Sequence, residues 1–191
     1  MKAVCILGSP RSDGSTATIL EKITDIFKER GIEVTRYDLG KANIGYCLGC
    51  MTCANDEKCV QRDDMDIISS CIVESDIVMI ASPSYWGDVT GQMKVFIDRC
   101  TPFCNTNPDR KMISKGKTGV AVVVRAGQNV KENEDLLATI EHFLGHLEIP
   151  LKHRFHVEGI STVRDLESRP DVLERAITFG REIVNSVSDS I

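Results

Sequence analysis

The sequence predicts an α/β fold in which a doubly wound sheet of five parallel strands, in the order 2-1-3-4-5, is flanked by helices. Three observations predict it. Five short apolar runs alternate along the chain with segments whose apolar residues recur at helical spacing. The runs are apolar at consecutive positions, as in parallel strands that are buried on both faces. The length of 191 residues suits one domain, so residues 1–191 are expected to form a single unit.

The first apolar run, 2–7, leads into a loop at 8–16, called the phosphate loop below, and then into a helix with apolar residues from Ile19 to Phe27. Backbone N–H groups and the positive end of a helix dipole favour a phosphate at such a junction. Serine and threonine also cap helices, which is the alternative explanation, but one cap does not need so many hydroxyl groups. The expected phosphate ligands are Ser9, Arg11, Ser12, Ser15 and Thr16.

The kind of phosphate is indicated by two motifs that the sequence lacks. The dinucleotide motif G-x-G-x-x-G is absent, and so is the P-loop motif with its lysine. A loop rich in hydroxyl groups suits a terminal monophosphate dianion, which accepts many hydrogen bonds. Flavin mononucleotide (FMN) carries such a group.

Four cysteines follow the second predicted strand, 33–39, in a loop at about residues 44–62, called the cysteine loop below: Cys47, Cys50, Cys53 and Cys59. Tightly spaced C-x2-C-x2-C runs are typical of loops that hold a [4Fe–4S] cluster, and Gly49 allows a close backbone turn around it. Structural zinc usually takes its ligands from two separated pairs. Cysteines two residues apart rarely meet disulfide geometry. The cluster is the preferred interpretation, with zinc and thiols that carry no metal as alternatives.

The helix after the cysteine loop begins at an acidic segment, 63–66, whose aspartates are expected to cap the helix and match its dipole rather than to bind a metal. The third strand, 77–81, ends in a loop at 82–88, called the aromatic loop below, which holds the chain's single tryptophan. Ligands bind at the carboxyl ends of the strands in such sheets, so a flat ring is expected here. Rings that pack on the protein's own core are the alternative. The expected ring contacts are Pro83, Ser84, Tyr85, Trp86 and Gly87.

The next helix, 92–99, ends in Asp98 and Arg99, which are expected to be a structural pair rather than catalytic residues. Cys100 and Cys104 follow it and are expected to be unligated thiols.

The fourth strand, 118–124, ends in a third loop at 125–129, whose Gly127 is a further expected cofactor contact. His142 and His146 lie one helical turn apart, but the H-E-x-x-H motif is absent, so no metal role is expected for them. The remaining predicted elements are a helix at about 134–147, a strand at 150–159 and a terminal helix at 170–187.

Charge and composition exclude several classes of function. A net charge of −5 and a pI near 5.4 argue against non-specific nucleic-acid binding, which needs a basic face. No run approaches the roughly 18 to 20 apolar residues of a membrane span. The N-terminal residues lack the pattern of a signal peptide, so a cytoplasmic location is expected, with the eight cysteines reduced or bound to metal.

The phosphate loop, the four-cysteine spacing followed by Asp63-Asp-Met65, and the Pro83-Ser-Tyr-Trp-Gly87 turn together resemble the iron–sulfur flavoprotein family, within the flavodoxin-like, NADPH-dependent FMN reductases. The resemblance covers nearly the whole chain. It implies a flavodoxin-like fold, bound FMN and a [4Fe–4S] cluster. It also implies a homodimer or homotetramer in which the cluster of one subunit lies near the flavin of another, and a ferredoxin-type electron donor.

By this resemblance, specific residues correspond to the cofactor sites of the family. The phosphate of FMN falls to Ser9, Arg11, Ser15 and Thr16, the isoalloxazine ring to the segment from Pro83 to Gly87, and the cluster to Cys47, Cys50, Cys53 and Cys59.

Three functions follow as hypotheses. The first is an electron-transfer flavoprotein in which FMN and a cluster interconvert two-electron and one-electron chemistry, with no acid–base residue required. The second is a clusterless NAD(P)H-dependent FMN or quinone reductase, whose cysteines are structural or redox-sensing. The third, which the two ligand loops disfavour, is a zinc-stabilised binding module.

Overall fold

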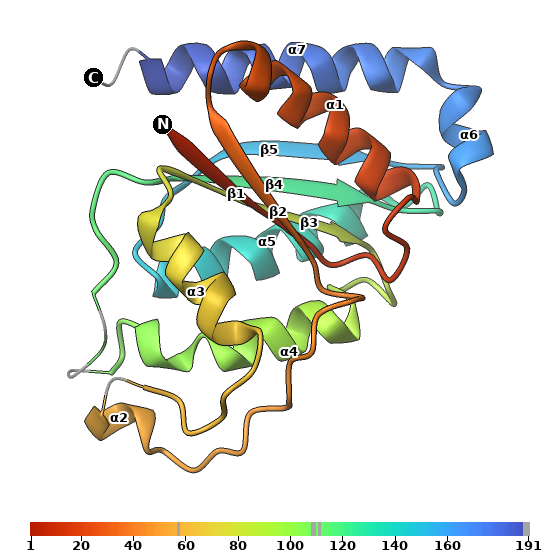
Figure 1. Ribbon diagram of the computed structural model, residues 1–191. Coiled ribbons are helices and arrows are strands. Elements are labelled where there is room, and N and C mark those ends of the chain that lie inside the picture. Colours follow the sequence, from red (N-terminus) through yellow and green to blue (C-terminus); the bar gives the residue numbers. More distant parts are fainter. Residues whose placement is uncertain (57, 108–109, 111, 189–191) are drawn as a thin grey trace.

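The sheet is the organising element of the computed structural model, which describes residues 1–56, 58–107, 110 and 112–188 (Figure 1). Its five strands pair in parallel in the order β2-β1-β3-β4-β5, which confirms the predicted topology. The strands are β1 (Lys2–Leu7), β2 (Glu33–Asp38), β3 (Ile77–Pro83), β4 (Thr118–Val124) and β5 (Leu151–Val157).

Burial separates the central strands from the edges of the sheet. β4 is buried at every residue, and β1 and β3 at all but one. The edge strands β2 and β5 are partly exposed. The continuous apolar runs in the sequence therefore mark strands that have helices on both faces, as parallel sheets require.

Two helical layers sandwich the sheet (Figure 1). α1 (Ser15–Glu29) and α7 (Pro170–Ser188) lie together on one face, with the short helix α6 (Val163–Glu167) beside them. α3 (Met65–Glu74), α4 (Gly91–Arg99) and α5 (Val130–His146) cover the other face. Gly180 lets α7 approach α1 closely, because a Cβ there would lie 3.0 Å from the carbonyl oxygen of Ile23.

Several boundaries differ from the prediction. α5 begins at Val130 rather than near residue 134, because Asn129 caps it by accepting a hydrogen bond from the N–H of Lys131 at 3.1 Å. β5 is shorter than predicted at both ends. Three short helices were not predicted: α2 (Cys53–Asp56), η1 (Thr101–Phe103) and α6.

The cysteine loop is inserted between β2 and α3, as predicted. In Figure 1 the inserted segment leaves the carboxyl end of β2 and runs along α4 on the side away from the sheet. In the described part of the chain, no helix is long and apolar enough to cross a membrane.

Candidate functional site

The phosphate loop is fixed from two neighbouring elements at the carboxyl edge of the sheet. The N–H of Gly8 donates to the carbonyl oxygen of Ala81 at 2.7 Å. The carbonyl oxygen of Gly8 accepts from Thr90 Oγ1 at 2.6 Å and from Gln92 Nε2 at 2.7 Å. A Cβ at Gly8 would lie 2.8 Å from the side chain of Met93, so the first residue of the loop is held against α4.

The hydroxyl groups of the phosphate loop do not cap α1. The N-cap is Gly14, and no side chain caps the helix there, so the capping alternative is wrong. Ser9, Ser15 and Thr16 are nevertheless buried. Ser15 Oγ has no hydrogen-bond partner among the described residues, although it is buried at the positive end of a helix. A buried hydroxyl without a partner is costly, and an anion at the helix start would satisfy it.

The two other predicted phosphate ligands are placed differently. Arg11 is exposed, and its guanidinium Nη2 donates to the carbonyl oxygen of Ser161 at 3.1 Å. Ser12 is half-buried, and its carbonyl oxygen accepts from Arg36 Nη2 at 2.6 Å. Both residues therefore help to hold the loop in this structure.

The aromatic loop is a tight hairpin turn. Tyr85 and Asp88 exchange backbone hydrogen bonds of 2.9 and 3.2 Å, and Trp86 and Gly87 between them have φ values of 57° and 78°. Two central residues with positive φ are typical of a type I′ turn. The Trp86 ring is fully exposed and Tyr85 is partly so, which contradicts the alternative in which these rings pack on the protein's own core.

The third loop lies beside the aromatic loop at the same edge. The N–H of Ser84 donates to the carbonyl oxygen of Val124 at 2.8 Å, and a Cβ at Gly87 would lie 3.6 Å from the side chain of Glu132. Arg125 of the third loop forms an ion pair with Glu132 of α5 at 2.5 Å. Gly127 packs against the Arg125 guanidinium, so this loop is closed over by its own arginine. The structure thus brings the three predicted ligand loops together at one edge of the sheet.

The four cysteines of the cysteine loop line one small pocket, which also contains Arg99, Thr101 and Pro102 from the end of α4 and from η1. Cys47 and Cys50 are exposed, whereas Cys53 and Cys59 are partly buried, and all are free thiols. Gly49 and Met51 have φ values of 62° and 60°, so the chain turns twice between the first and third cysteines. The predicted close turn at Gly49 is confirmed.

The thiols also interact electrostatically. Burial raises the pKa of the Cys53 thiol, and the neighbouring Cys59, Cys47 and Cys50 raise it further. A hydrogen bond from Thr52 Oγ1, 3.5 Å from Cys50 Sγ, lowers the pKa of Cys50. All four cysteines line one pocket, and the other three lie close enough to Cys53 to contribute to the rise in its pKa.

The lining of this pocket bears on which metal group could bind there. Among the described residues, no three His, Cys, Asp or Glu side chains form a ready site for a single metal ion. In a [4Fe–4S] cluster each thiolate binds a different iron. Four thiols that line one pocket supply the set of ligands such a group needs.

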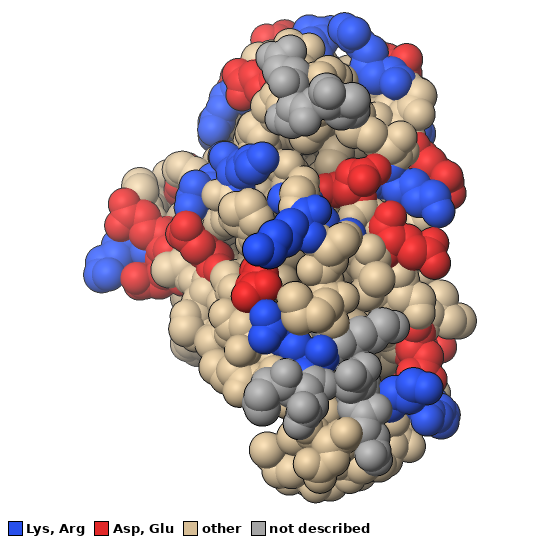
Figure 2. All heavy atoms as spheres, turned by 90° about the vertical axis from the view of Figure 1, so that its left-hand side faces the viewer, with Lys and Arg blue, Asp and Glu red and all other residues tan. Residues whose placement is uncertain are grey.

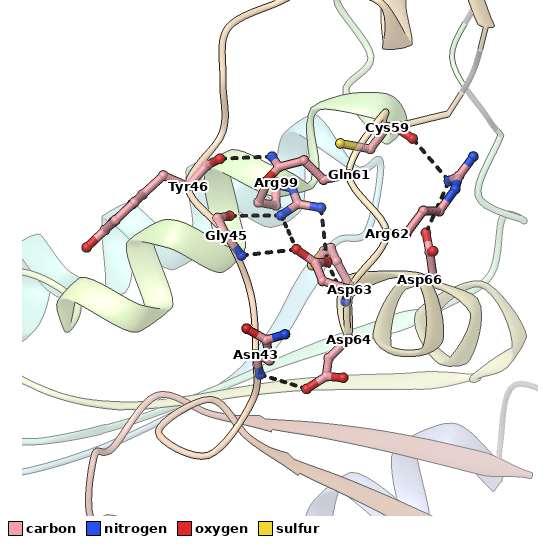
Figure 3. Close-up of polar contacts among 11 residues, drawn as sticks. Asn43, Gly45, Tyr46, Cys59, Gln61, Arg62, Asp63, Asp64, Asp66 and Arg99 are labelled. Carbon is pink, nitrogen blue, oxygen red and sulfur yellow. Dashed lines mark hydrogen bonds and ion pairs between the residues drawn. The ribbon is translucent and has the colours of Figure 1, made fainter.

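Both ends of the cysteine loop are held by Asp63 and Arg99, for which the sequence predicted other roles (Figure 3). Asp63 does not only start α3: its carboxylate forms a bidentate ion pair with Arg99, at 2.6 and 3.1 Å, and accepts from the N–H of Gly45 at 3.0 Å. Asp64 is at the N-cap position but makes no side-chain cap bond. The expected pairing of Asp98 with Arg99 is wrong, since Asp98 pairs with Lys94.

The surface of the cysteine loop combines apolar and charged side chains, since Lys58 and Arg62 of the loop are exposed. Figure 2 shows one side of the molecule, on which acidic and basic side chains lie close together over the upper and middle parts. Large apolar side chains of the loop are exposed: Tyr46, Leu48 and Met51.

Comparisons with known proteins agree with this arrangement. Residues 1–150 match the sequence model of a family described as NADPH-dependent FMN reductase. An iron-sulfur flavoprotein of Archaeoglobus fulgidus is 44% identical over 127 residues, covering 66% of this chain and 56% of that protein. The iron-sulfur flavoprotein MJ0731 of Methanocaldococcus jannaschii is 35% identical over 144 residues, covering 75% of this chain and 70% of that protein.

Among solved structures, the NAD(P)H:quinone oxidoreductase of Methanothermobacter marburgensis has a similar fold, with a TM-score of 0.70 at 15% identity over 96% of each chain. The chain spans little more than half the length of the Archaeoglobus relative.

Proposed function

Because the chain belongs to the NADPH-dependent FMN reductase family and, within it, to the proteins named iron–sulfur flavoproteins, we propose that it is an electron-transfer flavoprotein that holds FMN and a [4Fe–4S] cluster. FMN passes one or two electrons, whereas one cluster passes one electron at a time, so the pair converts between the two kinds of transfer. The observation that carries the proposal is the coexistence of a four-sulfur pocket and a phosphate loop with an orphaned buried hydroxyl in one chain.

The phosphate loop is proposed to hold the FMN phosphate. Ser15, Thr16 and Ser9 supply hydroxyl groups at the start of α1, where the helix dipole favours the dianion. Arg11 and Ser12 complete the predicted set. Arg11 is exposed at the rim, so its guanidinium is free to exchange the carbonyl of Ser161 for the phosphate.

The aromatic loop is proposed to face the flavin ring. Trp86 and Tyr85 offer exposed aromatic surface, and the turn at Gly87 brings backbone close to a flat ligand. Pro83 and Ser84 lead into this turn from the end of β3. Gly127, beneath the Arg125 guanidinium, is proposed as a contact from the third loop.

The cysteine loop is proposed to hold the cluster through Cys47, Cys50, Cys53 and Cys59. The two sites lie near opposite ends of α4, because Thr90 and Gln92 bind the phosphate loop and Arg99 lines the cysteine pocket. Nine helical residues span roughly 14 Å at about 1.5 Å per residue. The protein's contribution is to fix this separation and to shield the sulfurs with apolar cover.

A homodimer or homotetramer is proposed as the working form. Exposed large apolar groups occur at both sites, Leu48 and Met51 in the cysteine loop and Trp86 in the aromatic loop, and such groups are enriched where proteins associate. Contact between subunits would bring the cysteine pocket of one chain toward the flavin edge of another. The proposed setting is cytoplasmic, where thiol ligands stay reduced.

Two electron donors are possible, and they separate the proposed function from a clusterless NAD(P)H-dependent FMN or quinone reductase. Stopped-flow mixing under anaerobic conditions should show flavin bleaching by a reduced ferredoxin, and the Cys50→Ser variant should lose this reaction while it keeps its FMN. Fast bleaching by NAD(P)H that Cys50→Ser leaves unchanged, together with no reaction with ferredoxin, would support the reductase instead.

A further inference from the structure

The two ends of the cysteine loop are tied together by side-chain bonds to the backbone (Figure 3). Asp64 Oδ2 accepts from the N–H of Asn43 at 2.7 Å, and Gln61 Nε2 donates to the carbonyl oxygen of Tyr46 at 2.9 Å. Asp63 Oδ2 accepts from the N–H of Gly45 at 3.0 Å. The cysteines therefore lie in a closed loop whose two ends run side by side.

One residue from outside the loop joins this closure. Arg99, the last residue of α4, donates from Nη1 to the carbonyl oxygen of Gly45 at 2.8 Å and from both terminal nitrogens to Asp63. Its guanidinium thus binds the incoming end of the loop directly and the outgoing end through the carboxylate. An arginine fork suits this task because its donors are planar and fixed relative to one another.

The ion pair between Arg99 and Asp63 is buried, and a buried ion pair is weak evidence for a purely stabilising role. The side chain of Arg99 is 1% exposed and that of Asp63 is 9% exposed. Burying two charges is expensive, and an apolar pair of similar volume often stabilises a protein as well or better. Burial alone would lower the pKa of Arg99 and raise that of Asp63. The hydrogen bonds between them outweigh this, so the pKa of Arg99 is raised and that of Asp63 is lowered, and both remain charged.

Arg99 also reaches the sulfurs. It lines the same pocket as all four cysteines, and it shares a second pocket with Cys59. Burial lowers the pKa of Arg99, but the hydrogen bond that Arg99 donates to Asp63 and the nearby Cys59 together raise it. Arg99 Nε is buried and has no hydrogen-bond acceptor among the described residues. A fixed positive charge with a spare donor therefore stands beside the predicted cluster ligands.

We propose that Arg99 is a positioning residue of the cysteine site, which, held by Asp63, fixes both ends of the loop and places a permanent positive charge beside Cys59. The inference rests on the proposed cluster. When that group accepts one electron from a ferredoxin-type donor, it gains one negative charge. A nearby fixed cation favours the more negative state, so Arg99 raises the reduction potential.

If Arg99 acts through its charge, substitutions of the two partners of the ion pair should shift the reduction potential in opposite directions. Arg99→Gln removes a positive charge and should lower the potential, whereas Asp63→Asn removes a negative charge and should raise it. Both variants lose the ion pair, so a merely structural role would shift both potentials in the same direction. The expected effect for Arg99→Gln is a tenfold change in the ratio of reduced to oxidised centres at fixed applied potential, which equals about 59 mV for one electron.

Arg62→Gln is the matched control. Arg62 also lies next to Cys59, since its Nη1 donates to the Cys59 carbonyl oxygen at 3.1 Å, but its side chain is 65% exposed. Removal of this charge should change the ratio less than threefold, because water and salt screen it. Arg99→Lys keeps the charge and loses the fork. In this variant the ratio of reduced to oxidised centres at fixed applied potential should stay within threefold of the wild-type ratio, while iron is released faster to a chelator.

The experiment is an anaerobic redox titration of the purified proteins, followed by electron paramagnetic resonance, with iron and sulfide measured per chain. Opposite shifts for Arg99→Gln and Asp63→Asn, with little change for Arg62→Gln, support the inference. If Arg99→Gln does not fold, the double variant Asp63→Asn/Arg99→Gln leaves no unpaired buried charge. Its potential should still fall, because Arg99 lines the sulfur pocket and Asp63 is not among the described residues that do.

The two possible failures give different results. A wild-type protein without iron and sulfide would refute the proposed cluster. A wild-type protein with a cluster would leave the proposed function standing. In that protein, shifts of the same sign for the two partners, or a double variant with the wild-type potential, would overturn the role of Arg99.

Discussion

Ser15→Ala tests the phosphate loop with effects of opposite sign on binding and on stability. Ser15 Oγ is buried without a partner among the described residues. A hydrogen bond to a charged group contributes about 1.5–3 kcal/mol, so its loss should weaken FMN binding roughly 10- to 150-fold. A buried hydroxyl left unsatisfied costs about 1–3 kcal/mol, so the apoprotein should be unchanged or more stable without it.

The assay combines two titrations of the apoprotein. FMN binding is followed by quenching of flavin fluorescence, and unfolding is followed in urea. Riboflavin, which lacks the phosphate, should bind wild type and Ser15→Ala equally. Thr24→Ala is the control, because its hydroxyl is buried in the same helix but already donates to the Glu21 carbonyl oxygen at 3.1 Å. It should lose about 1 kcal/mol of stability and keep its FMN affinity.

Two results would refute this reasoning. The first is an unchanged FMN affinity in Ser15→Ala together with lower stability of the apoprotein. The second is an equal loss of FMN and riboflavin affinity, which would place Ser15 away from the phosphate.

Three further predictions concern the other parts of the structure. Gly87→Ala should destabilise the protein by roughly 1–2 kcal/mol in urea and weaken FMN binding, because the residue has a φ of 78°; unchanged values would show that the turn readily accommodates a side chain. Burial, and then Lys152, lowers the pKa of His153 below its ordinary value of 6.5. As the pH falls, the unfolded chain therefore takes up a proton at this histidine before the folded protein does. The stability that is present above pH 6.5 is then lost below it. His153→Gln should therefore lose less stability than the wild type between pH 7.5 and pH 5.5 in urea titrations, and equal losses would contradict this. Cys50→Ser should bind FMN normally and contain less iron than the wild type, and a full iron content would exclude Cys50 as a ligand.

Much of the fold follows from local patterns in the sequence. β1, β3 and β4 are continuous apolar runs because both faces of the sheet are covered, and their order follows from right-handed crossovers between parallel strands. The helix α6 was missed, although Thr162 and Asp165 form a capping box that the T-x-x-D spacing could have revealed.

The candidate site was predictable where its residues are neighbours in sequence. The phosphate loop and the aromatic turn at Trp86 and Gly87 each lie within one short segment. The ion pair between Asp63 and Arg99 joins residues 36 positions apart, and only tertiary packing brings them together. The wrong pairing of Asp98 was avoidable, since Lys94 lies four residues before it on the same helix.

The central claim is that one chain holds both FMN and a [4Fe–4S] cluster, and a cofactor count on anaerobically purified protein tests it most directly. FMN, iron and acid-labile sulfide should be present at about one, four and four per chain, and dithionite should produce the paramagnetic signal of a reduced cluster. FMN without iron and sulfide, after reconstitution with both under reducing conditions, would contradict the claim.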